Sequence, residues 1–236
     1  MKRFWTDVTV DAADGGFLLK LDGRAVKTPK GLPQLLPAPA LADALAGEWR
    51  AVEGELQPAA MPLTGMANAA VDLVSADPHG FADGLSRYAE SDMLCYRADH
   101  PDELAALQAA RWQPLLDWAA ARFDIGFAVT AGVVHRPQPP QTLARIATAY
   151  RGFGPFALAA LSPLVTLSGS AVIPLALAHG ALGVDEAWAA SILDEAFQAD
   201  LWGEDSLAAA DRAARAAQFG AAARFLQLAG ATNFGR

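Results

Sequence analysis

Residues Gly152–Val184, GFGPFALAALSPLVTLSGSAVIPLALAHGALGV, form the longest uncharged stretch of the chain and decide between two folds. The stretch contains no Asp, Glu, Lys or Arg, and about 20 apolar residues suffice to cross the hydrocarbon core of a bilayer. As a transmembrane helix, it would make this a membrane protein. As a pair of buried helices, it would form the core of a globular one.

The details of the stretch favour a buried core. Pro155, Pro163 and Pro174 each lack a backbone N–H and would interrupt a continuous membrane helix. Small hydroxyl residues dilute its centre, the nearby positive charges lie on one side only, and no aromatic belt marks the other side. We therefore predict two buried helices with a break at residues 167–170, and no membrane span.

Composition narrows the class of protein further. The chain has 236 residues, of which 53% are hydrophobic and 19% charged, and these values exclude a disordered chain. The length allows one large or two modest domains, and abundant alanine favours helices. The net charge of −8 argues against nucleic-acid binding, because contact with phosphates needs a basic surface.

The cysteine count and the N-terminus indicate the compartment. Cys95 is the single cysteine, so no internal disulfide can form, which is typical of a reducing compartment. The N-terminal residues carry two positive charges but no apolar segment of a secretory signal. We expect a cytoplasmic protein, provided that Gly152–Val184 is core.

The residues before this stretch predict a small sheet followed by helices. Two turn signals, Asp14-Gly15-Gly16 and Asp22-Gly23, separate short apolar runs and indicate an antiparallel meander. A short strand at 93–96 is expected to pair with one at 127–134. Helices are expected near residues 40–54, 62–74, 77–91, 102–123, 142–150, 185–201 and 206–228. The predicted fold class is α+β, with a small α/β domain at 1–75 and a mainly helical domain at 76–236.

A search for catalytic and cofactor motifs finds none. The chain has no phosphate-binding loop and no dinucleotide fingerprint, so no nucleotide is expected. Ser168 lacks the flanking glycines of a serine elbow. Four scattered histidines and one cysteine do not build a zinc site. Cys95 and His100 suggest a nucleophile and base, but a buried small hydrophobe is the favoured interpretation of Cys95. We predict no catalytic residue, cofactor or metal.

An acidic segment, DEAWAASILDEAFQADLWGED, follows the uncharged stretch at residues 185–205. Asp194 and Glu195 could support a small acid–base or hydrolytic enzyme, but nothing nearby supplies an oxyanion hole, a pocket or a metal. The segment could also be a solvated helix face. Trp202 lies beside Glu204 and Asp205, and an aromatic anchor among charges is typical of a protein-binding surface.

Two further charged features have structural explanations. Arg87 and Arg97 bracket Asp92, and a structural ion pair among them is expected. The hairpin turn explains the charged residues of Asp22-Gly23-Arg24, although an exposed Arg24 or Lys27 could also contact a partner.

Several segments, taken together and in order, resemble one known family. They are LDGRAVKTP (21–29), Glu48-Trp49, MPLTGMANAAVD (61–72), YAESDMLCYRA (88–98), WQPLLDW (112–118), LSGSAVIPLAL (167–177) and LDEAFQADLWGED (193–205). The family is that of the assembly chaperones for the soluble catalytic (F1) sector of F-type ATP synthase, shared by mitochondria and alphaproteobacteria. Leu207 stands where family members usually have a glutamate.

The resemblance implies a non-enzymatic chaperone that holds the newly made alpha subunit until it pairs with the beta subunit. It also implies a small N-terminal α/β domain, a larger helical domain, and the mitochondrial matrix as the compartment of eukaryotic relatives. We expect the partner-binding surface to include Trp49, Glu195, Trp202, Glu204 and Asp205. Because Trp49 follows Leu41 and Leu45 at helical spacing, a place in the core is its alternative.

Overall fold

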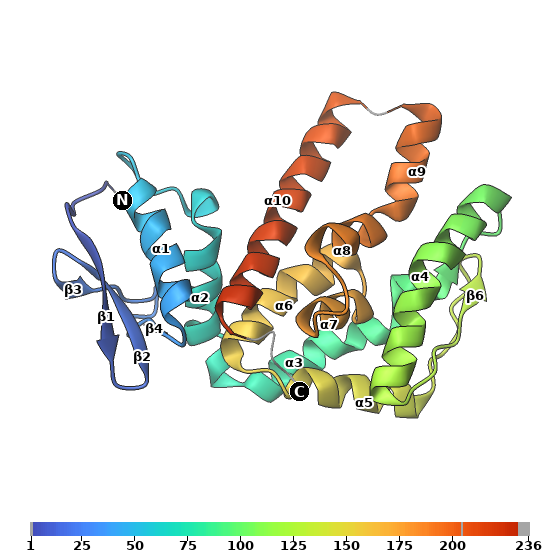
Figure 1. Cartoon of the computed structure of the whole chain (residues 1–236), viewed down its shortest axis with the longest axis horizontal. Coiled ribbons are helices and arrows are strands. Elements are labelled where there is room, and N and C mark those ends of the chain that lie inside the picture. The colour runs from blue at the N-terminus through green and yellow to red at the C-terminus, as the bar shows by residue number, and fades with distance from the viewer. Residues whose placement is uncertain (1, 204, 231–236) are drawn as a thin grey trace.

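The structure, a computed structural model, describes residues 2–203 and 205–230. Within them, a small sheet at the N-terminal end is followed by ten α-helices (Figure 1). The predicted α+β class is confirmed. The expected division into two domains at residue 75 stays a prediction. The helix α2 (Pro62–Asp72), on the N-terminal side of that boundary, packs against the later helices α6 (Pro155–Ser168) and α10 (Ser206–Leu228).

The sheet is built around its second strand. Strands β1 (Val8–Ala13) and β2 (Gly16–Leu21) pair antiparallel along their whole length, across a turn in which Gly15 has a φ of 83°. The other edge of β2 pairs with β3 (Arg24–Ala25) at one end and β4 (Leu35–Leu36) at the other. The predicted meander is therefore present, with a fourth short strand.

Helix α1 (Pro39–Ala51) packs against this sheet and buries its apolar face. Leu41 and Leu45 are fully buried, and Trp49 is only 7% exposed. The Trp5 indole N–H donates to the Trp49 carbonyl at 3.3 Å, and the two rings lie 5.1 Å apart. The structure thus places Trp49 in the core, as its helical spacing allowed, and we leave it out of the surface proposed below.

Carboxylates hold α2 at both of its ends. Glu48 of α1 accepts hydrogen bonds from the N–H groups of Leu63 and Thr64, both at 2.8 Å, and so caps the start of the helix. At the other end, Asp72 accepts from the Thr28 hydroxyl at 2.5 Å. Helix α2 therefore joins the sheet and α1 to the helices behind it.

The uncharged stretch forms the core, as predicted. It contributes α6 and α7 (Val172–Ala178), which are separated by Gly169 in a left-handed conformation with a φ of 62°. Side chains such as Leu158 and Leu161 are fully buried. Among the described residues, no helix is both long and apolar enough to cross a membrane.

The middle of the chain follows the expected order. Helix α3 (Pro78–Ser86) precedes α4 (Asp102–Phe123), which continues through Pro114, and α5 (Pro140–Arg151) follows. Strands β5 (Tyr96–Arg97) and β6 (Thr130–Ala131) pair in parallel, which confirms the expected pairing. The expected bounds of the first strand are wrong, because Met93–Cys95 form a 3₁₀ turn and the strand begins at Tyr96. Short 3₁₀ turns occupy Pro58–Ala60, Val74–Ala76, Arg87–Ser91 and Met93–Cys95.

The single helix expected at residues 185–201 is wrong, because two helices occupy this region. They are α8 (Val184–Ser191) and α9 (Leu193–Trp202), which meet at Ile192 with a φ of −110° and a ψ of 15°. At the break, the Ala190 carbonyl accepts a hydrogen bond from the Trp112 indole of α4. The Trp112 indole thus satisfies a carbonyl at the end of α8 that has no hydrogen-bond donor within the helix.

Helix α10 has the bounds predicted from the sequence and differs between its two halves. Phe219, Phe225 and Leu226 in its C-terminal half are at most 1% exposed, and the helix packs there against α6 and α2. Residues 206–211 are all exposed. Figure 1 shows that α9 and α10 form a hairpin that projects away from the helical base.

Candidate functional site

Asp92 fixes the start of α7, and α7 packs against α4 and α8. One oxygen of this buried carboxylate accepts from the Ser170 hydroxyl at 2.9 Å and the Ala171 N–H at 2.8 Å, and the other accepts from the Leu94 N–H at 3.1 Å. Burial raises the pKa of Asp92 to about 6. The expected ion pair with Arg87 and Arg97 is wrong, because backbone and hydroxyl donors surround the carboxylate.

Two hydrogen bonds set the position of α4 relative to α8 and α9. The Gln108 amide donates to the Asp194 carboxylate at 2.8 Å, and the Trp112 indole donates to the Ala190 carbonyl at 3.0 Å. Gln108 and Trp112 are both 1% exposed, so these bonds are shielded from water. They hold the two groups of helices at a fixed separation.

A groove of about 700 Å³ lies between these helices. Its α4 side includes Leu107, Pro114 and Trp118, and its other side includes residues of α8 and α9 such as Leu193 and Phe197. Most of the lining is apolar, while carboxylates and one arginine stand among it. A concave apolar surface with a few polar groups is the usual form of a binding site.

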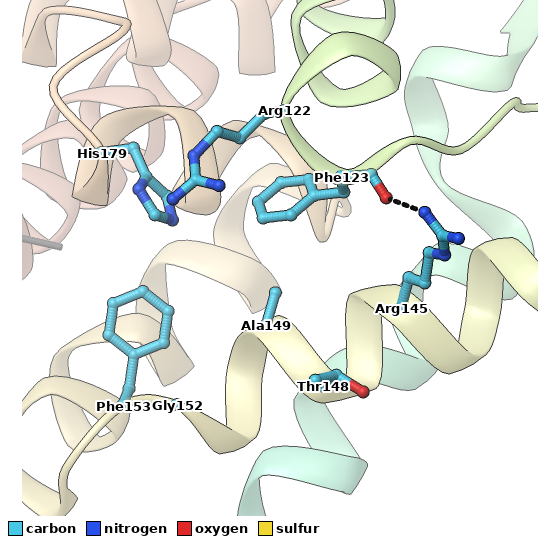
Figure 2. A pocket seen from close by; sticks show the side chains of 8 residues that line it. All are labelled: Arg122, Phe123, Arg145, Thr148, Ala149, Gly152, Phe153 and His179. Atoms are coloured by element: carbon cyan, nitrogen blue, oxygen red, sulfur yellow. Dashed lines mark hydrogen bonds between the residues drawn. The ribbon is translucent and has the colours of Figure 1, made fainter. Parts of the chain in front are cut away.

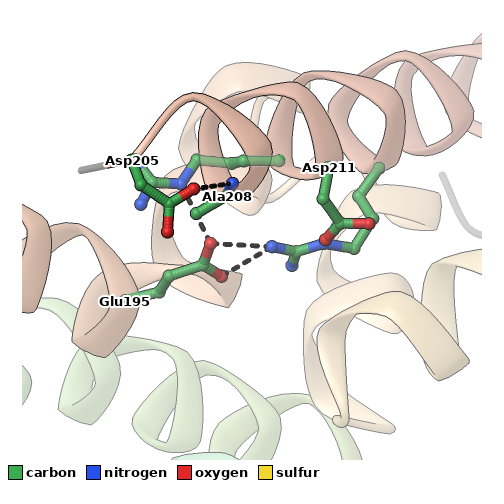
Figure 3. Close-up of polar contacts among 6 residues, drawn as sticks. Glu195, Asp205, Ala208 and Asp211 are labelled. Atoms are coloured by element: carbon green, nitrogen blue, oxygen red, sulfur yellow. Dashed lines mark hydrogen bonds and ion pairs between the residues drawn. The ribbon is translucent and has the colours of Figure 1, made fainter.

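Glu195 joins α9 to α10 within the hairpin. Its carboxylate accepts from Arg215 at 2.7 and 2.8 Å and from Arg212 at 3.0 Å, and Arg215 also pairs with Asp211 (Figure 3). The hydrogen bond from Arg215, and next that from Arg212, hold the pKa of Glu195 below its usual value of 4.5. Glu195 therefore links α9 to α10 through its ion pairs, and a contact between Glu195 and a partner stays a prediction.

Glu195→Gln is expected to destabilise the protein by about 1 kcal/mol at pH 7, since exposure screens the pairs. A lowered pKa means that this stability is present above pH 4.5 and lost as the pH falls below it. Urea unfolding at neutral and acidic pH measures the effect. Glu103→Gln, on an exposed surface of α4, is the control. An equal loss for both variants would show that the arginine pairs contribute nothing.

The tip of the hairpin exposes apolar side chains beside carboxylates. Leu201, Trp202 and Leu207 are 56%, 78% and 82% exposed, so their side chains have few internal contacts. Asp205 is the N-cap of α10 and accepts through one oxygen from the N–H groups of Leu207 and Ala208 (Figure 3). The expected site residue Glu204 lies outside the described residues. Trp202 and Asp205 thus share one exposed surface, which we call the hairpin tip (residues 201–203 and 205–207).

The structure gives no support to an acid–base or hydrolytic site. Asp194 and Glu195 are occupied by Gln108 and by two arginines, respectively. The Ser168 hydroxyl donates to the Leu164 carbonyl within its own helix at 2.7 Å. Cys95 is 1% exposed, and burial raises the pKa of its thiol to about 12. The favoured interpretation of Cys95 as a buried hydrophobe is confirmed.

A second pocket, of about 370 Å³, lies where α4 and α7 end against α5. Figure 2 shows Arg122 and Phe123 from α4, Arg145 from α5, and Phe153 and His179 around it. Arg145 donates to the carbonyls of Phe123 and Asp124, both at 2.9 Å. It therefore caps the last turn of α4, where unpaired carbonyls favour a cation. Arg145, on the wall of this pocket, thus stabilises the C-terminal end of α4.

Comparisons with known proteins identify the family of this chain. A family model described as ATP12 chaperone protein matches residues 2–120. The crystal structure of Atp12 from Paracoccus denitrificans has a TM-score of 0.91 and 40% sequence identity, with 98% of each chain covered. The chain belongs to the ATP12 chaperone family. This membership confirms the resemblance to ATP synthase assembly chaperones that the motif series predicted.

Two further proteins extend the comparison. A structure from Agrobacterium tumefaciens is 41% identical, with a TM-score of 0.91, and the match covers 96% of this chain and 85% of that one. The mitochondrial protein atp12 of Schizosaccharomyces pombe is 24% identical over 214 residues, which are 86% of this chain and 74% of that protein. The ATP12 fold therefore extends over nearly all of this chain.

Sequence reasoning missed the groove and the partners of Glu195. A fold of α9 back onto α10 at Gly203 would have placed Glu195 opposite Arg212 and Arg215, and the glycine was a usable signal. The groove left no such signal, because its walls come from residues 107–118 and 181–200, which meet only in the folded chain.

Proposed function

We propose that this ATP12 family member binds the unassembled alpha subunit of F-type ATP synthase, without catalysis, and prevents its aggregation until the beta subunit replaces the chaperone. The observation that carries the proposal is the hairpin tip, where Leu201, Trp202 and Leu207 are exposed beside Asp205. Family membership supports the assembly role, and the motif resemblance supports the alpha subunit as the partner. The bacterial cytoplasm is the proposed compartment, with the mitochondrial matrix as its counterpart.

The physics of such a chaperone needs no nucleotide. An unassembled subunit exposes surfaces that it later buries, and large exposed apolar patches promote aggregation. A chaperone that binds them shifts the equilibrium by mass action and is displaced by a partner with better complementarity. Apolar anchors such as Trp202 supply affinity, and carboxylates such as Asp205 select the partner and its orientation.

The deciding experiment is co-purification of the tagged chain with alpha and beta subunits expressed separately. We expect capture of alpha alone and loss of alpha when beta is added. Capture of neither subunit, from a chain shown to be folded by circular dichroism, contradicts the proposal. Replacement of Glu195, Glu204 and Asp205 with alanine should weaken the capture, and unchanged capture would remove these carboxylates from the binding surface.

Two single variants separate the anchor from the charge. Trp202→Ala is expected to weaken alpha-subunit binding by more than tenfold, because central aromatic anchors contribute about 2 kcal/mol or more. Asp205→Ser removes the charge but keeps a capping hydroxyl, so binding should fall while stability changes little. Affinity is measured by surface plasmon resonance. Val133→Ala, at a side chain 95% exposed elsewhere, is the control, and an equal effect of Val133→Ala and Trp202→Ala would refute the anchor.

A further inference from the structure

The groove between α4 and α8–α9 has no part in the function proposed for the hairpin tip, and its α4 wall is regular. Its α4 wall repeats at Leu107, Arg111, Pro114 and Trp118, which is the spacing of one helix face over three turns. At 1.5 Å per residue, this face is about 16 Å long. The opposite wall continues from α8 into α9, so the groove runs between two helical ridges.

We propose that this groove binds an amphipathic helix that carries a lysine or arginine on the flank facing α8 and α9. The source of the helix, an unassembled ATP synthase subunit, rests on the function proposed above. Its apolar stripe lies on Leu115, Trp118 and Phe197 in the groove, and its basic residue lies beside the carboxylates of the α8–α9 wall.

The apolar part of the groove fits a helix. Leu115 and Leu193 are buried and form the floor, whereas Leu107 is 37% exposed on the rim and Trp118 and Phe197 are half-buried. Two neighbouring helices leave a groove between their ridges, into which the side-chain ridge of a third helix packs. Amphipathic helices recognise such grooves through residues spaced three and four apart.

The charged residues of the two walls determine which side of the bound helix carries its basic residues. Asp185 and Asp200 are exposed on the α8–α9 wall, and the described residues offer neither of them an ion-pair partner. Glu186 on the same wall accepts a hydrogen bond from the Gly183 N–H. Arg111 stands on the opposite wall, so the two flanks of a bound helix meet opposite charges. This pattern orients a helix with a basic side toward α8–α9.

The same charges disfavour a second copy of this chain as the occupant. The chain has a net charge of −8, so a copy would on average bring further negative charge to the acidic wall. A basic flank on the occupant removes this repulsion. The proposed occupant is therefore a helix of a different chain.

The test uses a fluorescent synthetic helix of about four turns, with leucines at helical spacing and lysines along one flank. Its twin has glutamates in place of the lysines. Fluorescence anisotropy measures the affinity of the full chain for each probe. We expect the lysine probe to bind at least tenfold more tightly than the glutamate probe, with an affinity that falls as salt rises. Equal binding of the two probes overturns the proposal.

Two variants locate the binding. Ala189→Trp fills the groove from an exposed position and should weaken the lysine probe at least tenfold, whereas Ala214→Trp, on an exposed face of α10, should leave its affinity unchanged. Asp185→Asn combined with Asp200→Asn keeps side-chain size and should weaken only the lysine probe, by about tenfold. Unchanged binding by Ala189→Trp, or by the double variant if Ala189→Trp does not fold, contradicts the groove as the site.

The two proposals fail separately. If the chain captures the alpha subunit but Ala189→Trp binds the lysine probe and the subunit as the unaltered chain does, the groove is not the site while the chaperone function stands. If Ala189→Trp loses the lysine probe but the unaltered chain captures no ATP synthase subunit, the groove binds basic amphipathic helices while the proposed partner is wrong.

Discussion

Asp92→Ala is expected to lower the free energy of unfolding by about 3 kcal/mol at neutral pH, because the buried N–H groups of Leu94 and Ala171 lose their acceptor. For a chain of this length, the melting temperature should fall by roughly 10 °C. The Ser170 hydroxyl, which donates to the same carboxylate at 2.9 Å, also loses a partner. Thermal and urea unfolding followed by circular dichroism measure the loss.

The loss should depend on pH in a direction set by the raised pKa. The pKa of Asp92 lies at about 6 in the folded chain, against an ordinary value of 3.8, because burial opposes ionisation. The folded chain therefore binds a proton more tightly than the unfolded chain does. The resulting stability is present below pH 3.8 and is lost as the pH rises through about 6. The difference between the unaltered chain and Asp92→Ala should accordingly grow as the pH falls from neutral toward 4.

Two comparisons make this result interpretable. Asp92→Asn keeps one acceptor oxygen and should lose less stability than alanine while losing the pH dependence. Asp43→Ala, at an exposed position of α1, should change stability by no more than about 0.5 kcal/mol. Unfolding of Asp92→Ala at the same urea concentration as Asp43→Ala would show that the buried hydrogen bonds make no net contribution.

Trp112→Ala is expected to cost about 3–5 kcal/mol, the usual range for loss of a buried tryptophan. Its ring is 1% exposed and lies under the Arg97 guanidinium at 5.4 Å. Its indole N–H also holds the Ala190 carbonyl, so the substitution releases α8 from α4. Binding of the lysine probe should weaken together with stability, because Trp112 fixes the separation of the two groove walls.

Trp112→Phe separates the hydrogen bond from the packing. Phenylalanine retains most of the buried apolar area but has no N–H, so the cost should be about 1 kcal/mol. Trp202→Ala, which removes a ring that is 78% exposed, is the matched control for stability and should change it little. Equal destabilisation by Trp112→Ala and Trp202→Ala would contradict the assignment of Trp112 to the core.

Proline, glycine and apolar spacing were enough to predict most of the helices. The break at Gly169 and the bounds of α10 follow from local chemistry, because glycine readily takes the positive φ that ends a helix and Asp205 caps the start of α10. Proline alone is a weaker signal, since α4 continues through Pro114 and α6 through Pro163. Burial along α1 also follows from a local pattern, because the helical spacing of Leu41, Leu45 and Trp49 puts all three side chains on the inner face of the helix.

The remaining features depend on contacts between distant residues. Asp92 and Ser170 are 78 positions apart, and Trp112 and Ala190 are also 78 apart, so no local pattern connects them. The break at Ile192 goes with the second of these contacts and was missed for that reason. Of the site residues, Trp202 and Asp205 are exposed as a binding surface requires, whereas Glu195 is engaged by arginines of the facing helix.

The contrast between the two halves of α10 has a consequence for how the protein can change over time. Its buried half contributes to the core, so substitutions at Phe219 or Phe225 affect folding. Leu207, at the start of the same helix, is 82% exposed, and folding is nearly indifferent to its identity. Substitutions at the hairpin tip can therefore alter its surface chemistry without loss of the fold.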